Sequence, residues 1–185
     1  MTELPVLAFE SRAHWRDWLA REHSSSSGIW LKIAKKDSGI ASIDYQQALE
    51  EALCFGWIDG QRDRFDENWF LTRFTPRKAT SRWSERNCGL AEALTERGLM
   101  APAGLAAVAA AKSDGRWDAA YPSPANAAVP PDFQAALDAN PKAAERFAAL
   151  PSMGRYRFIY RLHHVNGPDA RVERIARYVE ELLND

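Results

Sequence analysis

The segment 57–87 gathers carboxylate, guanidinium and indole side chains within a short stretch of chain. It opens with "WIDG", where Trp57 and Asp59 stand beside a glycine, and continues to "RFTPRKATSRWSERN" over residues 73–87. The later stretch contains one acid, Glu85, and five bases: Arg73, Arg77, Lys78, Arg82 and Arg86. Guanidinium groups bind phosphate or carboxylate through two parallel hydrogen bonds. These residue types predict a site for an anion, and an acid–base reaction at Asp59 is the alternative.

Neutral donors and flat apolar side chains accompany these bases. A helix that begins at Ser84 would add free backbone N–H groups and partial positive charge at its N-terminus. The predicted ligand-binding residues are Trp57, Asp59, Arg73, Thr75, Arg77, Ser81, Trp83 and Asn87. The competing interpretation is a solvated basic surface on which Ser84 is an ordinary helix cap.

Asp59 is predicted to be a binding or structural carboxylate rather than a general acid. A hairpin that turns near residues 66–67 places Asp59 opposite Phe74, with Arg73 as a near neighbour. A nearby arginine lowers the pKa of a carboxyl group and keeps it ionised. We therefore expect Asp59 to pair with Arg73 or Arg77, and we assign no catalytic residue.

Histidine and cysteine give no metal or cofactor signal. His163 and His164 are adjacent in a predicted helix, so their side chains diverge by about 100°. Cys54 and Cys88 lack CxxC spacing, and we predict two buried thiols. GxSxG, Walker A, GxGxxG and HExxH are absent from the sequence. We expect neither a metal nor a cofactor.

Composition narrows the classes of partner. The chain has 185 residues and a net charge of −1, which argues against a protein that coats nucleic acid. Aromatic residues among bases could stack single-stranded nucleic acid, but Asp59, Asp63, Asp66 and Glu67 dilute the positive field, so the nucleic-acid signal is weak. No run approaches the roughly 20 apolar residues that span a bilayer, and the N-terminus lacks the features of a secretory signal. We expect a cytoplasmic protein without membrane insertion.

Hydrophobic periodicity and turn residues predict an α+β fold. Helices are predicted from Ser11 to about His23 and over 44–55, where Asp44 and Gln47 have capping-box spacing. Strands are predicted at 29–36, 57–65 and 68–75. Further helices are predicted at 84–97, 102–112, 131–139, 141–149, 155–165 and 168–183.

The expected architecture is therefore a small, mostly antiparallel sheet of about three strands, packed with helices and followed by an all-helical C-terminal segment. We predict an α+β domain over 1–114, a linker rich in Pro and Ala over 115–131, and the helical segment over 132–185.

Several motifs, taken in order, resemble the bacterial YdeI/OmpD-associated proteins, also called bacteriocin-protection proteins. They are "CFGWIDG", "RFTPRK", "SRWSERN" and "GLMAPAGL", and the family motif falls on Trp57, Asp59, Gly60, Arg73, Thr75, Pro76, Arg77, Ser81, Trp83 and Asn87. Near the C-terminus, Pro168, Arg171, Arg174 and Ile175 match the family, while neutral side chains replace expected bases. The resemblance implies a role in envelope stress or in tolerance of antimicrobial peptides, with a membrane-associated porin as partner.

Three functions remain open. The first is a non-enzymatic protein that binds an anionic small molecule or an anionic group on a partner protein. The second is an uncharacterised small-molecule enzyme that uses Asp59 as acid or base. The third is a protein-interaction module, which predicts an exposed apolar patch on the C-terminal helices.

Overall fold

The computed structural model describes residues 4–124, 126–165 and 167–184. The chain forms two compact units, one ending at Ala120 and the other starting at Tyr121. The boundary between the units lies within the Pro- and Ala-rich stretch 115–131. The outermost residues of the predicted domains, 1–3 and 185, lie outside the described residues.

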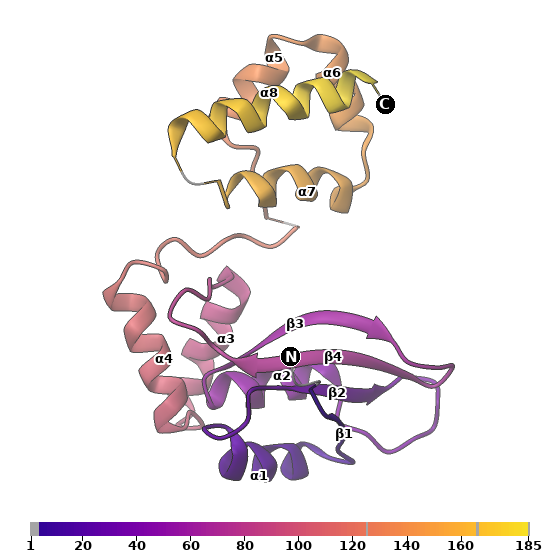
Figure 1. Ribbon diagram of the computed structural model, residues 1–185, viewed down its shortest axis with the longest axis vertical. Coiled ribbons are helices and arrows are strands. Elements are labelled where there is room, and N and C mark those ends of the chain that lie inside the picture. The colour runs from indigo at the N-terminus through magenta and orange to yellow at the C-terminus, as the bar shows by residue number, and fades with distance from the viewer. Residues whose placement is uncertain (1–3, 125, 166, 185) are drawn as a thin grey trace. The chain divides into compact units, whose positions relative to one another are not determined.

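The N-terminal unit contains a four-stranded mixed sheet (Figure 1). Its strands, in the spatial order β1-β2-β4-β3, are β1 (Val6–Ala8), β2 (Ile29–Ala34), β4 (Trp69–Pro76) and β3 (Trp57–Arg64). The β2–β4 and β4–β3 pairs are antiparallel, whereas β1 pairs with β2 in parallel. The α+β class is confirmed, but the expected three strands are four and the sheet is mixed. The missed strand has only three residues, too few for an alternating pattern to show.

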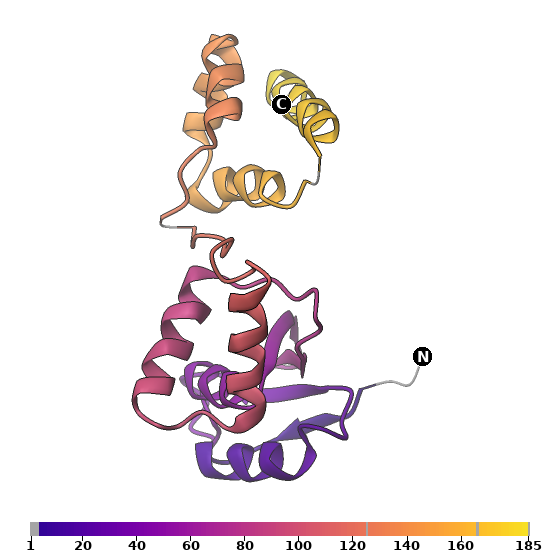
Figure 2. The ribbon, with the colours of Figure 1, turned by 90° about the vertical axis from the view of Figure 1, so that its left-hand side faces the viewer.

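Four helices complete this unit: α1 (Arg12–Glu22), α2 (Tyr45–Cys54), α3 (Glu85–Glu96) and α4 (Pro102–Ser113). Figures 1 and 2 show helices gathered on one side of the sheet. Ser11 caps α1, and Asp44 and Gln47 form the predicted capping box of α2, with the Gln47 backbone N–H 2.8 Å from Asp44 Oδ1. These caps fix where the two helices begin.

Aromatic side chains fill the space between the sheet and these helices. Trp15 of α1 contacts Trp57 and Phe74 of the sheet, with ring centroids 6.3 and 5.9 Å apart. The indole N–H groups of Trp15 and Trp57 donate to the carbonyl oxygens of Ala48 and His23, at 3.1 Å each. Both of these buried indoles therefore have their one donor satisfied. Cys54 and Cys88 are buried thiols, as the sequence predicted.

Two glycines let α4 pack closely on the end of α2. A Cβ atom at Gly104 would lie 2.2 Å from the carbonyl oxygen of Cys54, a distance that no side chain tolerates. Gly56 has a φ of +72°, and a Cβ there would lie 2.9 Å from the carbonyl oxygen of Ala103. The motifs "CFG" (54–56) and "PAG" (102–104) thus supply the backbone atoms that meet where α4 packs on the end of α2.

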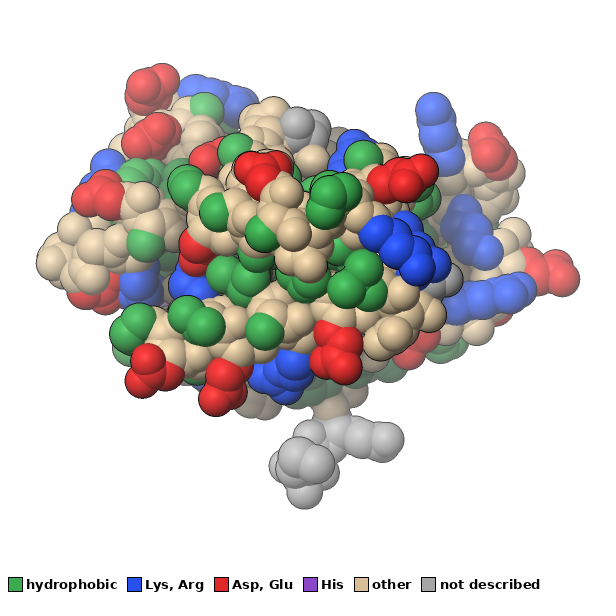
Figure 3. Space-filling model, turned by 90° about the horizontal axis from the view of Figure 1, so that it is seen from above, with side chains coloured by type: hydrophobic (Ala, Val, Ile, Leu, Met, Phe, Trp, Pro, Cys, Tyr) green, Lys and Arg blue, Asp and Glu red, His purple; other side chains and the backbone are tan. Residues whose placement is uncertain are grey.

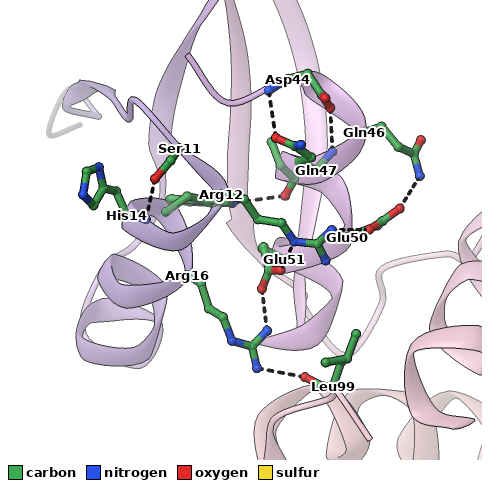
Figure 4. Close-up of polar contacts among 12 residues, drawn as sticks. Ser11, Arg12, His14, Arg16, Asp44, Gln46, Gln47, Glu50, Glu51 and Leu99 are labelled. Atoms are coloured by element: carbon green, nitrogen blue, oxygen red, sulfur yellow. Dashed lines mark hydrogen bonds and ion pairs between the residues drawn. The ribbon is translucent and has the colours of Figure 1, made fainter. Parts of the chain in front are cut away.

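A buried carboxylate ties α1 to α2 (Figure 4). Glu51 is 2% exposed, and it accepts hydrogen bonds of 2.5 Å from Arg12 Nε and from Arg16 Nη1. Arg12 also pairs with Glu50 at 2.9 Å, and Arg16 donates to the Leu99 carbonyl oxygen at 3.0 Å. We call Arg12, Arg16, Glu50 and Glu51 the Glu51 cluster. It joins α1, α2 and the chain before α4 through charges that balance one another.

The C-terminal unit is a separate helical bundle of α5 (Pro131–Asp138), α6 (Pro141–Ala149), α7 (Ser152–Leu162) and α8 (Pro168–Asn184). Prolines open α5, α6 and α8, where a missing N–H costs nothing. The core of this unit is aromatic, with Phe158 packed edge-on against Tyr178 at 4.9 Å. The predicted helical C-terminal segment is confirmed.

The surface of the C-terminal unit carries few large exposed hydrophobic side chains among its described residues. They are Met153 of α7, 66% exposed, and Val172 of α8, 67% exposed. Figure 3 shows hydrophobic side chains between the helices nearest the viewer, with acidic and basic side chains along their edges. The interaction-module hypothesis remains a prediction. No helix in the described part of the chain is long and apolar enough to cross a membrane.

Candidate functional site

The predicted site residues divide into groups with different surroundings. Trp57 is fully buried in the core, and Arg73 is exposed on β4. Thr75 lies against Gly28, where a Cβ atom would come within 2.7 Å of the threonine methyl group. Asn87 is buried in the first turn of α3, and its backbone N–H donates to the Ser84 hydroxyl at 3.1 Å. Trp57, Thr75 and Asn87 are thus packed within the fold, whereas Arg73 is exposed.

Asp59 has a different partner from the one we predicted. It lies opposite Phe74 as expected, but the hydroxyl group of Tyr45 donates to Asp59 Oδ2 at 2.7 Å. In the described part of the chain Asp59 forms no ion pair, so the expected pairing with Arg73 or Arg77 is wrong. Arg73 is next to Phe74 in the strand, so its side chain points to the opposite face of the sheet from Asp59. Arg77 lies after the end of β4 and stacks on Trp83 instead.

Tyr45 acts as the donor of this hydrogen bond. Burial, the hydrogen bond to Asp59 and the negative charge of that carboxylate all raise the pKa of Tyr45. A phenol with a raised pKa stays protonated at neutral pH and serves as a donor, not as a base. The Tyr45–Asp59 pair therefore joins α2 to β3.

The second group of predicted residues lies around a cavity of about 210 Å³. We call it the Arg77 pocket, and its lining residues are Arg77, Lys78, Ala79, Ala107, Ala110 and Arg116. Three of these side chains are cationic and three are alanines. Sequence analysis assigned Arg77, and it placed Ser81 and Trp83 beside it.

A tight turn after β4 shapes one wall of the pocket. The backbone N–H of Arg77 donates to the Gly56 carbonyl oxygen at 2.9 Å, which fixes the end of the strand. The Ser81 hydroxyl accepts from the backbone N–H of Lys78 at 2.9 Å, and the Ser81 N–H donates back to the Lys78 carbonyl oxygen at 2.9 Å. Ser81 is thus a turn-forming residue that holds Lys78 at the rim.

Arg77 is fixed by an aromatic platform. Its guanidinium carbon lies 3.6 Å from the centroid of the Trp83 ring, and Nη1 donates to the Arg82 carbonyl oxygen at 3.1 Å. Trp83 in turn packs against Trp117, with ring centroids 4.9 Å apart. Trp83 is buried beneath Arg77, so it orients the cation rather than forming an open wall.

Sequence analysis missed Arg116, which reaches the pocket from the stretch predicted to be a linker. Its Nη1 donates to the Ser81 carbonyl oxygen at 2.9 Å, and its Nε lies 2.8 Å from Asp114 Oδ2. The Arg116 hydrogen bonds lower the pKa of the Asp114 carboxyl group, so that carboxylate stays ionised. The contact joins Arg116, in the motif "DGR", to the Ser81 carbonyl oxygen 35 residues away, and no local sequence pattern predicts it.

A further hollow of about 520 Å³ lies elsewhere in this unit, beside the start of α2. Its lining includes Lys35, Lys36, Arg62 and Tyr45, together with Asp44 and apolar residues. Arg62 stacks on Phe70 at 3.8 Å, and Lys35 Nζ donates to the Glu67 carbonyl oxygen at 2.8 Å. Arg62 and Lys35 are thus engaged with the protein itself, and an acid, Asp44, lies among the lining residues.

Comparison with known families assigns the two parts of the chain separately. A family described as "Domain of unknown function (DUF8412)" matches residues 7–107, more than half of the chain. The chain belongs to this family. The family described as "Bacteriocin-protection, YdeI or OmpD-Associated" matches residues 126–185, which confirms the predicted resemblance for that part. Neither curated proteins nor solved structures gave a match.

The two matches place the sequence motifs in different families. The residues of 57–87 fall within the first match, whereas the YdeI/OmpD-associated match covers α5 to α8. The Arg77 pocket, except for Ala110 and Arg116, therefore lies in the part whose family has no described function.

Proposed function

We propose that this YdeI/OmpD-associated protein acts by binding a single oxyanion group in the Arg77 pocket. The observation that carries the proposal is the set of three cationic side chains around one small cavity, with no acid among the six described lining residues. Arginine forks bind phosphate or carboxylate in a fixed geometry. The setting is the cytoplasm, in a response to envelope stress or to toxic peptides.

Preorganisation supports this proposal. Arg77 is held by Trp83, and Arg116 is held by Ser81 and Asp114, so neither guanidinium group must be ordered when the ligand arrives. The α4 wall of alanines leaves space without competing hydrogen bonds. A volume near 210 Å³ lies below the range of about 300–1,000 Å³ typical of drug-sized ligands. The expected ligand is inorganic phosphate, a small carboxylate, or one such group on a partner protein.

The test is a calorimetric titration of the full chain with inorganic phosphate and with small carboxylates. Arg77→Ala and Lys78→Gln should each weaken binding about tenfold, the loss of one charge-assisted contact. Arg21→Ala is the matched control, since Arg21 is an exposed arginine of α1 outside the pocket. Absence of binding by every anion, or equal binding by the wild type and the two pocket variants, overturns the proposal.

All seven tryptophans lie in the N-terminal unit, and Trp83 contacts Arg77 directly. Anion binding at the pocket should therefore change tryptophan fluorescence. The change should disappear in Arg77→Ala.

A further inference from the structure

The C-terminal unit contains its own cavity, of about 470 Å³, between the end of α7 and the start of α8. We call it the Tyr160 pocket, and its lining residues are Tyr160, Arg161, His164, Val165, Ala170 and Arg174. It is more than twice the volume of the Arg77 pocket. It falls within the range of cavities that hold whole small molecules.

Two arginines face this cavity without an acidic partner. Arg161 and Arg174 line it, and neither forms an ion pair in the described part of the chain. Other arginines of the same unit are engaged: Arg171 donates to Asp132 Oδ1 at 3.0 Å, and Arg157 pairs with Glu181. Among the described lining residues there is no acid, so two cations face the cavity.

Arg174 also carries a donor that lacks an acceptor. Its Nε is buried and makes no hydrogen bond among the described residues. A buried N–H without a partner costs about 1–3 kcal/mol, so buried donors in proteins are nearly always satisfied. An oxyanion that reaches Nε after a small movement of the Arg174 side chain would remove this cost.

Aromatic rings stand beside the arginines. The Tyr160 and His164 rings lie 4.0 Å apart between centroids and are tilted by 39°. Tyr156 extends the group, with its ring centroid 5.6 Å from that of Tyr160. Tyr160 and His164 also line the cavity, so a flat ring could pack on this wall while an attached anion meets the arginines.

We propose that the Tyr160 pocket binds a small molecule in which an oxyanion, phosphate or carboxylate, is attached to a flat ring. Arg161 and Arg174 bind the anion, and the Tyr160 ring packs against the flat group. The site is independent of the function proposed for the Arg77 pocket, because it uses other residues in another unit.

The test titrates the full chain with adenosine monophosphate, benzoate, adenosine and inorganic phosphate, following the amide signals of residues 160–174 by NMR. We expect adenosine monophosphate, benzoate or both to shift these signals, and to do so at least tenfold more tightly than adenosine or phosphate. A response only to the monophosphate identifies a phosphate site, and a response only to benzoate identifies a carboxylate site.

Arg161→Gln and Arg174→Gln should each weaken this binding at least tenfold. Arg177→Gln is the matched control, because Arg177 is an exposed arginine of α8 outside the cavity lining. Far-UV circular dichroism checks that each variant folds, and Arg161, which is exposed, can be replaced even if Arg174 is needed for folding. No signal change with any ring-bearing anion, or equal affinity in Arg161→Gln and Arg177→Gln, overturns the proposal.

The two proposals fail separately. Tryptophan fluorescence reports only on the N-terminal unit, where all seven tryptophans lie. Loss of phosphate binding in Arg77→Ala leaves the NMR response of residues 160–174 unchanged if both sites exist.

Discussion

The Glu51 cluster and the Arg77 pocket are both built from arginines, but in the first the arginines are neutralised by acids and in the second they face a cavity. In the Glu51 cluster two arginines meet two glutamates, and the central carboxylate is almost fully buried. In the Arg77 pocket three cations surround a cavity, and the carboxylate beside them, Asp114, lies outside its described lining. A balanced and enclosed set of charges holds helices together, whereas an unbalanced set beside a cavity favours an anion.

The largest effect should come from Glu51→Gln. The variant removes the charge that two arginines share, but those arginines are about one-third exposed and keep other acceptors, so the expected loss is about 1.5–3 kcal/mol of unfolding free energy. Urea denaturation measures this loss. Glu50→Gln is the control, because Glu50 is more exposed and, among the described residues, forms a single ion pair, with Arg12; it should lose about 1 kcal/mol. Equal losses in the two variants would contradict the structural role of the Glu51 cluster.

Gly104→Ala should disturb the α4 wall of the Arg77 pocket. The added Cβ would meet the Cys54 carbonyl oxygen, so α4 must shift, at about 1–3 kcal/mol of unfolding free energy. Phosphate affinity, measured by calorimetry, should fall as well, since Ala107 and Ala110 move with α4. Gly89→Ala in α3 meets nothing within 4 Å and should stabilise the protein by about 0.5–1 kcal/mol. If Gly104→Ala behaves like Gly89→Ala, the close contact is not required.

Tyr45→Phe tests whether Asp59 has a structural role, as Glu51 does, or belongs to the Arg77 pocket. The variant loses one hydrogen bond to a carboxylate, worth about 1.5 kcal/mol of unfolding free energy in thermal or urea unfolding. Phosphate affinity at the Arg77 pocket should stay within twofold of the wild type. A tenfold loss of affinity would place Asp59 in the binding site, as the sequence alone suggested.

The smallest loss of unfolding free energy is expected for Asp132→Asn. Asp132 lies in α5 and forms an ion pair with Arg171 of α8. The hydrogen bond from Arg171 lowers the pKa of Asp132 in the folded protein. Its stabilisation is therefore present above the unfolded pKa of about 4 and disappears as the pH falls through the lower folded value. Because the pair is partly exposed, Asp132→Asn should lose less than about 1 kcal/mol at pH 7, and this difference should shrink as the pH falls below about 4. A difference from the wild type that does not shrink with falling pH in urea unfolding would contradict this account.

Local patterns predicted most of the fold. The capping box at Asp44, the alternation of Ile29, Leu31 and Ile33, and the prolines that open α4 to α6 depend on neighbours in sequence, and the elements appear where these patterns placed them. Strand β1 was missed because three residues show no period, and its parallel pairing with β2 depends on where the chain returns after α1.

The candidate site was only partly predictable. Arg77 and Trp83 are six residues apart and meet through a local turn, so the basic stretch revealed them. Arg116 comes from a distant, irregular segment, and Trp57 was predicted to bind the ligand although its indole packs in the core. Residue type alone does not separate an aromatic platform from a core side chain.

The sequence by itself determined the helices, the hairpin and the register that places Asp59 opposite Phe74, because caps, turns and alternation act over a few residues. Only the tertiary structure decided which charges are paired. The partner of Asp59 became Tyr45 because α2 packs over the same face of the sheet, and Arg116 joined Arg77 because a distant loop returns to Ser81. A charge is satisfied by whatever lies within a few ångströms of it, and that neighbour is set by the path of the whole chain.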